Sequence, residues 1–282
     1  MADRVADFFL RHITSSRTAT LPGGRLPFRV GALAVGWLKP DFAQIFAQTA
    51  GLTPDEGGGI TLPDARVAEL PALAQAIGES GRYRLRGEMF DVRAGEEGPA
   101  ITMLDRGAVP SFGIVSHGVH CNGLVERPDG LHIWVARRSA TKLLDPGKLD
   151  HIVAGGISAG MGADDTMIKE AGEEAGIPPS LAAQAQRVGR LRYDMERGEG
   201  LRRDLLYCYD LVLPADFTPM PSDGEVEAFE LWPIERAVKT VRDTDHFKFN
   251  VNLVLIDLFL RRSLIAPAEA AHTLRHALDQ PA

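Results

Sequence analysis

Residues 155–177 read GGISAGMGADDTMIKEAGEEAGI, in which a glycine-rich run is followed by an acidic, helix-like pattern. Asp164 and Asp165 lie where a helix N-terminus favours acidic side chains, because the first backbone N–H groups of a helix point there. Gly176 is a residue type that ends helices in the left-handed conformation, and Pro178 does not continue one. The stretch therefore predicts a loop followed by a helix over 164–175.

Three glutamates, Glu170, Glu173 and Glu174, follow one side of this predicted helix at i, i+3 and i+4 spacing. Carboxylates at such spacing repel by about 0.2–0.5 kcal/mol per pair unless a cation neutralises them. Oxygen-only ligands select a hard divalent ion such as Mg²⁺ or Mn²⁺, and a glycine-rich loop brings backbone N–H groups close to a phosphate. The combination predicts metal-assisted chemistry on a phosphorylated ligand, whereas three acids alone would more often form a solvated face.

The composition is that of an ordinary globular protein. The 282 residues include 45% hydrophobic and 24% charged side chains, with a formal net charge of −7. Because nucleic-acid binders usually carry a basic surplus, we expect no nucleic acid partner. Cys121 and Cys208 form no CxxC pair, which fits a reducing cytosol. The sequence shows neither a signal-peptide pattern nor a long apolar run, so we expect a cytoplasmic protein that binds no membrane.

The pattern along the chain changes near residue 105. Beyond it, β-like runs at 115–125, 131–136, 187–192, 205–212 and 231–234 are interspersed with helical patterns at 164–175, 246–262 and 268–278. This order predicts an α/β sandwich. The first hundred residues predict shorter mixed elements: helices near 5–13, from Pro40 and over 70–77, strands over 28–38 and 83–86, and a linker over 93–99. We therefore expect a small mixed α+β N-terminal domain (1–105) and a second domain (106–282).

Residues 155–177 resemble the Nudix box, G-x5-E-x7-R-E-U-x-E-E-x-G-U, in which U is an aliphatic residue. With Gly155 as the first glycine, the three glutamates, Gly176 and Ile177 fall on matching positions. Met161 stands where the box has its first glutamate, and Lys169 replaces its arginine. In the family these two residues form chiefly a supporting pair, so the departures concern the rigidity of the loop more than metal binding.

A narrower resemblance covers most of the chain, densely from about residue 110 to 265 and more loosely before it. The chain is similar to a thiamine-pyrophosphokinase-related Nudix subgroup, which has an extra N-terminal domain and also lacks the first box glutamate. The likeness rests on Pro146-Gly147, Leu149-Asp150, Val153-Ala154-Gly155-Gly156, Arg203-Asp204-Leu205, Tyr209-Asp210, Asp223-Gly224-Glu225-Val226 and Phe229. The resemblance implies a Nudix α/β/α sandwich with a mixed sheet. It also implies hydrolysis of thiamine diphosphate analogues of the oxythiamine type to the monophosphate.

The resemblance further implies the residues of the site. Mg²⁺, with Mn²⁺ as the alternative, would be held by Glu170, Glu173, Glu174 and the carbonyl of Gly155. For the general base we expect Glu173 first, or else Glu225 or Glu227 from a later loop. The candidates for substrate binding are Gly155, Gly156, Arg137, Arg138, Lys142 and Arg203. As residue types, these four cations are more often solvated charges.

Two other interpretations stay open. A Nudix hydrolase of another diphosphate, such as ADP-ribose or a different nucleoside diphosphate derivative, would share the catalytic helix and differ in its pocket. A non-catalytic ligand-binding module would keep only the fold, but the three intact acids speak against it. A GxSxG-like string around Ser158 imitates a nucleophile elbow, although the box explains the same glycines. For the N-terminal domain three roles stay open: shaping the pocket, forming a homodimer surface, or binding a partner.

Overall fold

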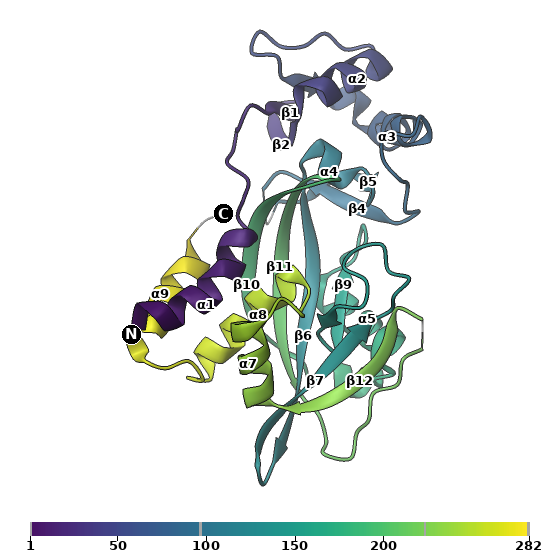
Figure 1. Cartoon of the computed structure of the whole chain (residues 1–282). Helices are drawn as coiled ribbons and strands as arrows, with labels where there is room; N and C mark the ends of the chain where they lie inside the picture. Colours follow the sequence, from purple (N-terminus) through teal and green to yellow (C-terminus); the bar gives the residue numbers. More distant parts are fainter. Residues whose placement is uncertain (1, 96–97, 223, 281–282) are drawn as a thin grey trace.

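The computed structural model describes residues 2–95, 98–222 and 224–280. Over these residues, a seven-stranded mixed sheet has the order β10-β11-β6-β7-β12, with β8 beside β7 and β9 beside β6 (Figure 1). Its strands are β6 (Val115–Arg127), β7 (Gly130–Arg138), β8 (Leu149–Asp150), β9 (Val153–Gly156), β10 (Gln186–Arg197), β11 (Gly200–Val212) and β12 (Val226–Pro233). Strands β6 and β11 are parallel, and the other neighbours are antiparallel.

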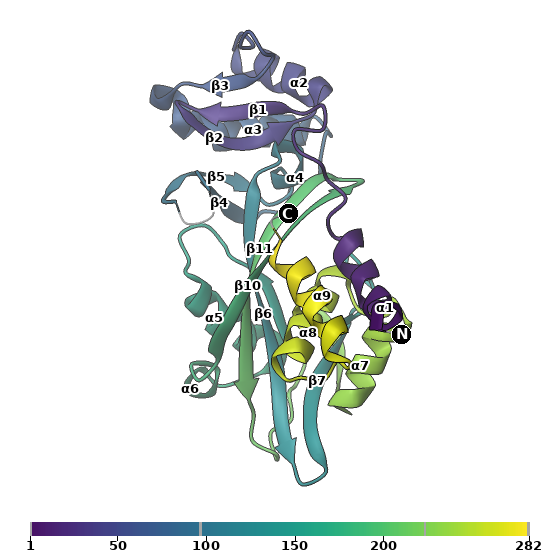
Figure 2. The ribbon, with the colours of Figure 1, turned by 90° about the vertical axis from the view of Figure 1, so that its left-hand side faces the viewer.

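Helices cover both faces of this sheet (Figure 1; Figure 2). One face carries α5 (Ala163–Ala175) and the short α6 (Pro179–Ala182), and the other carries α1 (Ala2–Ser15), α7 (Ile234–Asp243), α8 (Phe249–Arg261) and α9 (Ala268–Asp279). Because side chains alternate along a strand, Cys208 packs into the core beneath α8 while its neighbour Tyr209 packs into the core beneath α5. The predicted α/β/α sandwich is confirmed, and both cysteines are buried and unpaired.

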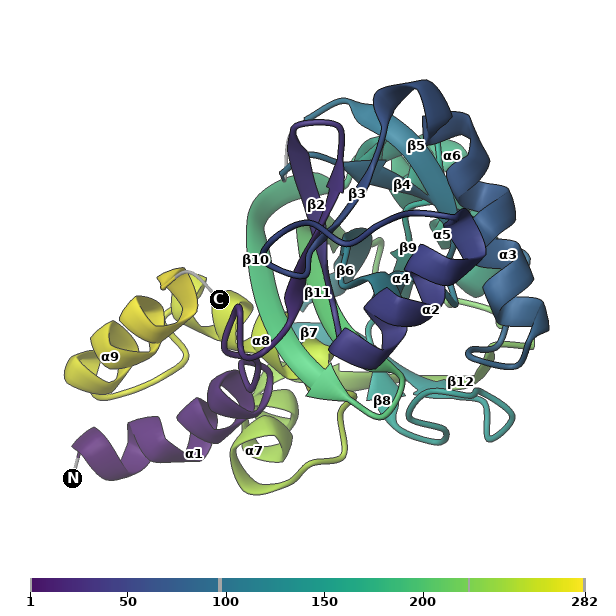
Figure 3. The ribbon, with the colours of Figure 1, turned by 90° about the horizontal axis from the view of Figure 1, so that it is seen from above.

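A second hydrophobic core is formed mainly by residues 26–112, which we call the accessory module. Figure 3 shows the helices and strands of this module from above. It contains β1 (Leu26–Val30), β2 (Leu33–Leu38), α2 (Pro40–Ala50), β3 (Ile60–Leu62), the 3-10 helix η1 (Asp64–Glu69), α3 (Leu70–Glu79), β4 (Met89–Arg93), β5 (Ala100–Asp105) and α4 (Val109–Phe112). Phe28, Phe46 and Phe112 form its centre, with ring centroids 5.1–5.5 Å apart. The expected mixture of helices and strands is confirmed.

The first helix packs away from the accessory module. Ala6, Phe9 and Ile13 of α1 are buried in the core that also contains the apolar faces of α8 and α9, and α1 lies beside α9 (Figure 1). The boundary expected at residue 105 stays a prediction. In space, however, α1 belongs with the elements that follow that boundary.

Some local predictions in the first hundred residues are wrong. The range 28–38 is a hairpin of two strands, because Gly31 takes a left-handed conformation (φ 54°) and turns the chain. The range 83–86 is irregular, and the next strand begins at Met89. The expected linker over 93–99 instead joins β4 to β5, with residues 96–97 outside the described part. Among the described residues, no helix is both long and apolar enough to cross a bilayer.

Candidate functional site

Helix α5 lies against strand β9, and two of the three predicted metal-binding carboxylates point to this contact. Glu174 is only 7% exposed, and its Oε2 accepts a hydrogen bond from the backbone N–H of Ala154 at 2.8 Å. Glu170 approaches the backbone of Gly155 so closely that a Cβ there would lie 2.5 Å from its Cδ. Glycine at this position therefore leaves room for the Glu170 carboxyl against the strand, and a larger residue would displace it.

Among the described residues, no buried cation forms an ion pair with either of the two inward carboxylates. Burial raises the pKa of Glu174 well above its ordinary value, and burial also raises the pKa of Glu170. The negative charge of Glu170 adds to the rise in the pKa of Glu174, and the ammonium of Lys169 lies 3.3 Å from Oε1 of Glu170. Two hard oxygen donors whose negative charge is disfavoured by burial suit a divalent cation. The carbonyl of Gly155, on the adjacent strand, would add a third oxygen donor.

The third glutamate of the set has a different environment. The side chain of Glu173 is 52% exposed and pairs with Lys169, whose Nζ lies 2.5 Å from its Oε2. It therefore lies on the solvent side of the same helix, where a carboxylate can reach a water molecule. The structure thus separates the trio into the buried Glu174, the partly buried Glu170 and the accessible Glu173, and the proposed role of each stays a prediction.

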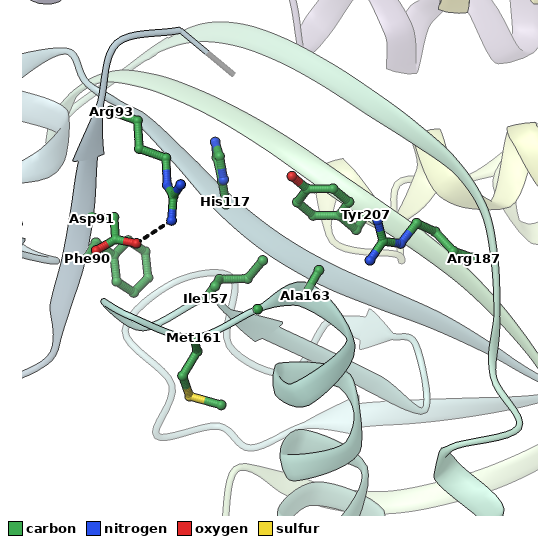
Figure 4. A pocket seen from close by; sticks show the side chains of 10 residues that line it. Phe90, Asp91, Arg93, His117, Ile157, Met161, Ala163, Arg187 and Tyr207 are labelled. Carbon is green, nitrogen blue, oxygen red and sulfur yellow. Dashed lines mark hydrogen bonds and ion pairs between the residues drawn. The ribbon is translucent and has the colours of Figure 1, made fainter. Parts of the chain in front are cut away.

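A pocket of about 310 Å³ lies at the N-terminal end of α5, between the seven-stranded sheet and the accessory module (Figure 4). Its floor includes Ile157, Met161 and Ala163, which belong to the glycine-rich loop and the first turn of α5. The remaining lining is Phe90, Asp91, Arg93, His117, Gly162, Arg187 and Tyr207. The loop that leads into the acidic helix therefore also forms part of the pocket.

Aromatic and charged groups give this pocket a defined edge on β10 and β11. The guanidinium carbon of Arg187 lies 5.1 Å from the centre of the Tyr207 ring and 5.7 Å from that of Tyr209. Arg187 also pairs with Asp164 at 2.8 Å, and the hydroxyl of Tyr209 donates to the same carboxylate at 2.6 Å. These contacts hold the Arg187 guanidinium and the two tyrosine rings in place at the start of α5.

The four predicted substrate-binding cations lie elsewhere on the second domain. Arg138 is buried, and its guanidinium bonds Asp150 as well as the carbonyls of Leu144 and Asp145. Arg203 donates to Asp194 and to the carbonyl of Gly113. Arg137 is exposed, 3.8 Å from Glu230, and Lys142 pairs with Glu225. None of these four residues lines the pocket, so the structure does not bring them together with Arg187 and Tyr207. Their roles stay predictions.

The three general-base candidates are likewise dispersed. Glu225 is engaged by Lys142, and its carbonyl accepts a hydrogen bond from the backbone N–H of Ser139 at 2.9 Å. Glu227 is exposed at the irregularity of the β12 ladder between Val226 and Ala228. Asp223, which belongs to the run that resembles the thiamine-related subgroup, lies outside the described residues. Of the three candidates, Glu173 is the one on the helix that carries the buried acids.

A separate group of potential metal ligands is buried between the sheet and α8. Ligand atoms of His120, Asp150 and His151 lie within 4.8 Å of one another, and the two Nδ1 atoms of the histidines are 3.0 Å apart. Asp150 is already neutralised by Arg138 at 2.7 Å and Lys248 at 3.7 Å. A metal ion would meet both positive side chains there, so we interpret the group as a structural polar network.

Sequence reasoning missed the contribution of the accessory module. Phe90, Asp91 and Arg93 line the pocket from β4, about sixty-five residues before the loop on which the pocket is built. No local spacing relates them to the acidic helix, since only the folded contact between β4 and the loop brings them there. Arg187 and Tyr207 are nearer in sequence, on β10 and β11, but they too belong to no motif that joins them to the loop.

Comparisons with known proteins identify the family of the chain. Residues 117–253 match the family described as NUDIX domain. Nudix hydrolase 20, chloroplastic, of Arabidopsis thaliana is 34% identical over 282 residues, covering 94% of this chain and 75% of that protein. Nudix hydrolase 24, chloroplastic, of the same plant is 36% identical over 260 residues, covering 87% and 70%.

Among solved structures, the MutT protein from Methanosarcina mazei Go1 superposes with a TM-score of 0.41 at 15% identity, covering 53% of this chain and 95% of that one. The two plant relatives exceed 30% identity, and this chain spans more than two thirds of each. The chain therefore belongs to the Nudix hydrolase family.

Proposed function

We propose that the chain hydrolyses a diphosphate linkage in a small molecule whose ring occupies the pocket at the start of α5. The observation that carries the proposal is the continuity of the two features. Residues 161–163 line the pocket, and the same helix continues to Glu170 and Glu174 against β9. A ligand with its ring beside Tyr207 would therefore have its phosphates directed along the helix toward the carboxylates.

The proposed chemistry divides among groups of this chain. Glu170, Glu174 and the carbonyl of Gly155 would hold a divalent cation, with Glu173 nearby. Such a cation supplies neutralisation of the diphosphate oxygens and lowers the pKa of a bound water. Glu173 accepts the proton of the attacking water, as a solvent-accessible carboxylate on the same helix can. The bond from phosphorus to the bridging oxygen breaks, and the departing phosphate keeps that electron pair.

For the substrate, we propose a thiamine diphosphate analogue of the oxythiamine type. The resemblance of residues 110–265 to the thiamine-related subgroup supports it, and so does the size of the pocket. A volume of about 310 Å³ is at the lower end of the range for small-molecule sites, roughly 300–1,000 Å³. This favours one compact ring system over a larger dinucleotide. ADP-ribose, the second candidate, is an arm of the test.

The test measures phosphate release with Mg²⁺ from thiamine diphosphate, oxythiamine diphosphate, ADP-ribose and nucleoside diphosphates, adding a coupled phosphatase where the product is a phosphate ester. The variants are Tyr207→Ala and, as a control, Phe8→Ala, which removes an exposed aromatic ring on α1. We expect preference for the oxythiamine compound and an increased KM in Tyr207→Ala alone. Activity on ADP-ribose alone would overturn the substrate, and binding without turnover of any compound would overturn hydrolysis.

A further inference from the structure

The glycine-rich loop before α5 is bonded to strand β4 of the accessory module. The hydroxyl of Ser158 donates to Oε1 of Glu88 at 2.9 Å. The backbone N–H of Ala159 donates to the carbonyl of Met89 at 2.7 Å, and that of Gly160 donates to Oδ1 of Asp91 at 3.3 Å. Three consecutive loop residues thus take their partners from one short stretch of another module.

The partner residues, on β4 and at Glu88 just before it, are held by further contacts of their own. Oε2 of Glu88 pairs with Arg106 at 2.8 Å, and the guanidinium of Arg106 lies 5.3 Å from the centre of the Phe90 ring. Asp91 pairs with Arg93 at 2.5 Å. Phe90 also packs on the strand that precedes the loop, since a Cβ at Gly156 would lie 2.4 Å from its Cζ. The acceptors are therefore held in place by contacts other than those with the loop.

Among the described residues, the loop is held to the sheet and α5 by apolar packing and by few hydrogen bonds. Met161 carries no charge and packs against the core beneath α5. Lys169 directs its ammonium to Glu170 and Glu173 on its own helix. The two positions therefore form no ion pair between loop and helix. The loop's backbone bonds within the second domain include Ile157 to the carbonyl of His117 at 2.9 Å. The β4 contacts supply the remaining anchoring at Ser158, Ala159 and Gly160.

We propose that β4 braces this loop, with Glu88 and Asp91 as positioning residues for the hydrolytic site. By fixing Ser158 and Gly160, they hold both the pocket floor and the strand that carries Gly155. Loss of a hydrogen bond to a charged acceptor typically weakens a site by about tenfold or more. The assignment rests on the proposed function for its kinetic consequence, but the brace itself has a readout that does not require activity.

The direct readout is hydrogen exchange of the Ala159 and Gly160 amides in the full chain, with and without Mg²⁺. We expect both amides to be protected in the wild type and to exchange roughly tenfold faster in the double variant Glu88→Ala/Asp91→Ala. Glu69→Gln is the matched control, because Glu69 pairs with Arg66 on the exposed side of the same module at 2.7 Å. Unchanged exchange in the double variant would overturn the brace.

Measurements of kcat distinguish a positioning role of the Ser158–Glu88 hydrogen bond from an effect on folding or of the Glu88 charge. Glu88→Gln and Ser158→Thr keep an acceptor and a hydroxyl, so they should retain kcat, whereas Glu88→Ala and Ser158→Ala should each lower it roughly tenfold. The double variant Ser158→Ala/Glu88→Ala should have a kcat no lower than that of either single variant, because each substitution removes the same hydrogen bond. If Glu88→Gln lost as much as Glu88→Ala, the charge and not the bond would matter, and the proposal would be wrong. A wild type that hydrolyses nothing would defeat the proposed function, while the exchange experiment would still test the brace.

Discussion

The backbone N–H of Ala154 donates a hydrogen bond to Oε2 of Glu174 at 2.8 Å, which fixes a buried carboxylate against strand β9. One bond to a backbone amide satisfies only part of what a buried carboxylate needs. The neighbouring Glu170 adds a further negative charge instead of relieving it. This relationship is the structural reason to expect a cation at the helix, and the first prediction follows from it.

Divalent metal should stabilise the folded protein. Because a cation bound to Glu170 and Glu174 would offset their buried charge, Mg²⁺ or Mn²⁺ should raise the unfolding temperature by a few degrees, and a chelator should reverse the effect. Glu174→Gln should abolish the response, while Glu235→Gln on the exposed face of α7 should keep it. Thermal unfolding with and without metal measures this. An equal metal response in Glu174→Gln would place the cation elsewhere.

The general base should be on the acidic helix. Glu173→Gln should reduce kcat by about 100-fold or more, as loss of a general base does, with the metal-dependent stabilisation largely kept. Glu225→Gln and Glu227→Gln should retain most of the wild-type rate, because Glu225 pairs with Lys142. Initial rates at saturating substrate measure the comparison. If Glu173→Gln were as fast as the wild type and Glu227→Gln were slow, the order of candidates would be reversed.

How far the sequence predicts this site depends on the range of the interactions. The spacing of the glutamates and the position of Gly176 predict α5 to within one residue, because caps and helical periodicity are local. The same spacing does not say that Glu170 and Glu174 turn toward β9 while Glu173 faces solvent, since that depends on how the helix packs.

The accessory module illustrates the limit more strongly. Glu88 and Asp91 carry no motif, and their contacts with the loop join residues about seventy positions apart in the chain. The first helix shows the same effect, because its apolar face predicts burial without naming the partner. Its partners, α8 and α9, are at the opposite end of the chain.

The packing of α1 predicts a large loss of stability in Phe9→Ala, and the neighbouring Phe8 provides the control. Phe9 is 1% exposed in the core beneath α8, whereas the adjacent Phe8 is 44% exposed. Phe9→Ala should therefore lower the free energy of unfolding by about 3–5 kcal/mol. Phe8→Ala should change it by less than about 0.5 kcal/mol. Denaturant unfolding compares the two variants, and equal effects would show that α1 does not pack as described.

The buried histidine pair should make the protein sensitive to mild acid. Burial lowers the pKa of His151 from 6.5 to about 4, and burial also lowers the pKa of His120. Well above pH 6.5 both histidines are neutral in the folded and unfolded chains, so their titration does not change the stability there. As the pH falls toward 4, the unfolded chain binds protons that the folded chain excludes, and the free energy of unfolding should decrease by roughly 3 kcal/mol through His151 alone.

Denaturant unfolding at several pH values between 7 and 4 checks this acid sensitivity. His151→Gln should flatten the pH dependence, even if it lowers stability at neutral pH. His272→Gln removes an exposed histidine on α9 and should leave the dependence unchanged. A wild-type profile that is flat between pH 6.5 and 4, or a His151→Gln profile as steep as that of the wild type, would disprove the explanation.

The most direct measurement is the initial rate of phosphate release from oxythiamine diphosphate with Mg²⁺, compared among the wild type, Glu174→Gln and Glu235→Gln, with the other diphosphates assayed alongside. We predict that Glu235→Gln matches the wild type. Glu174→Gln should be at least about 100-fold slower on any diphosphate that the wild type hydrolyses, because it removes a buried ligand carboxylate. A Glu174→Gln variant that folds and keeps the wild-type rate would contradict the assignment of the acidic helix as the hydrolytic site.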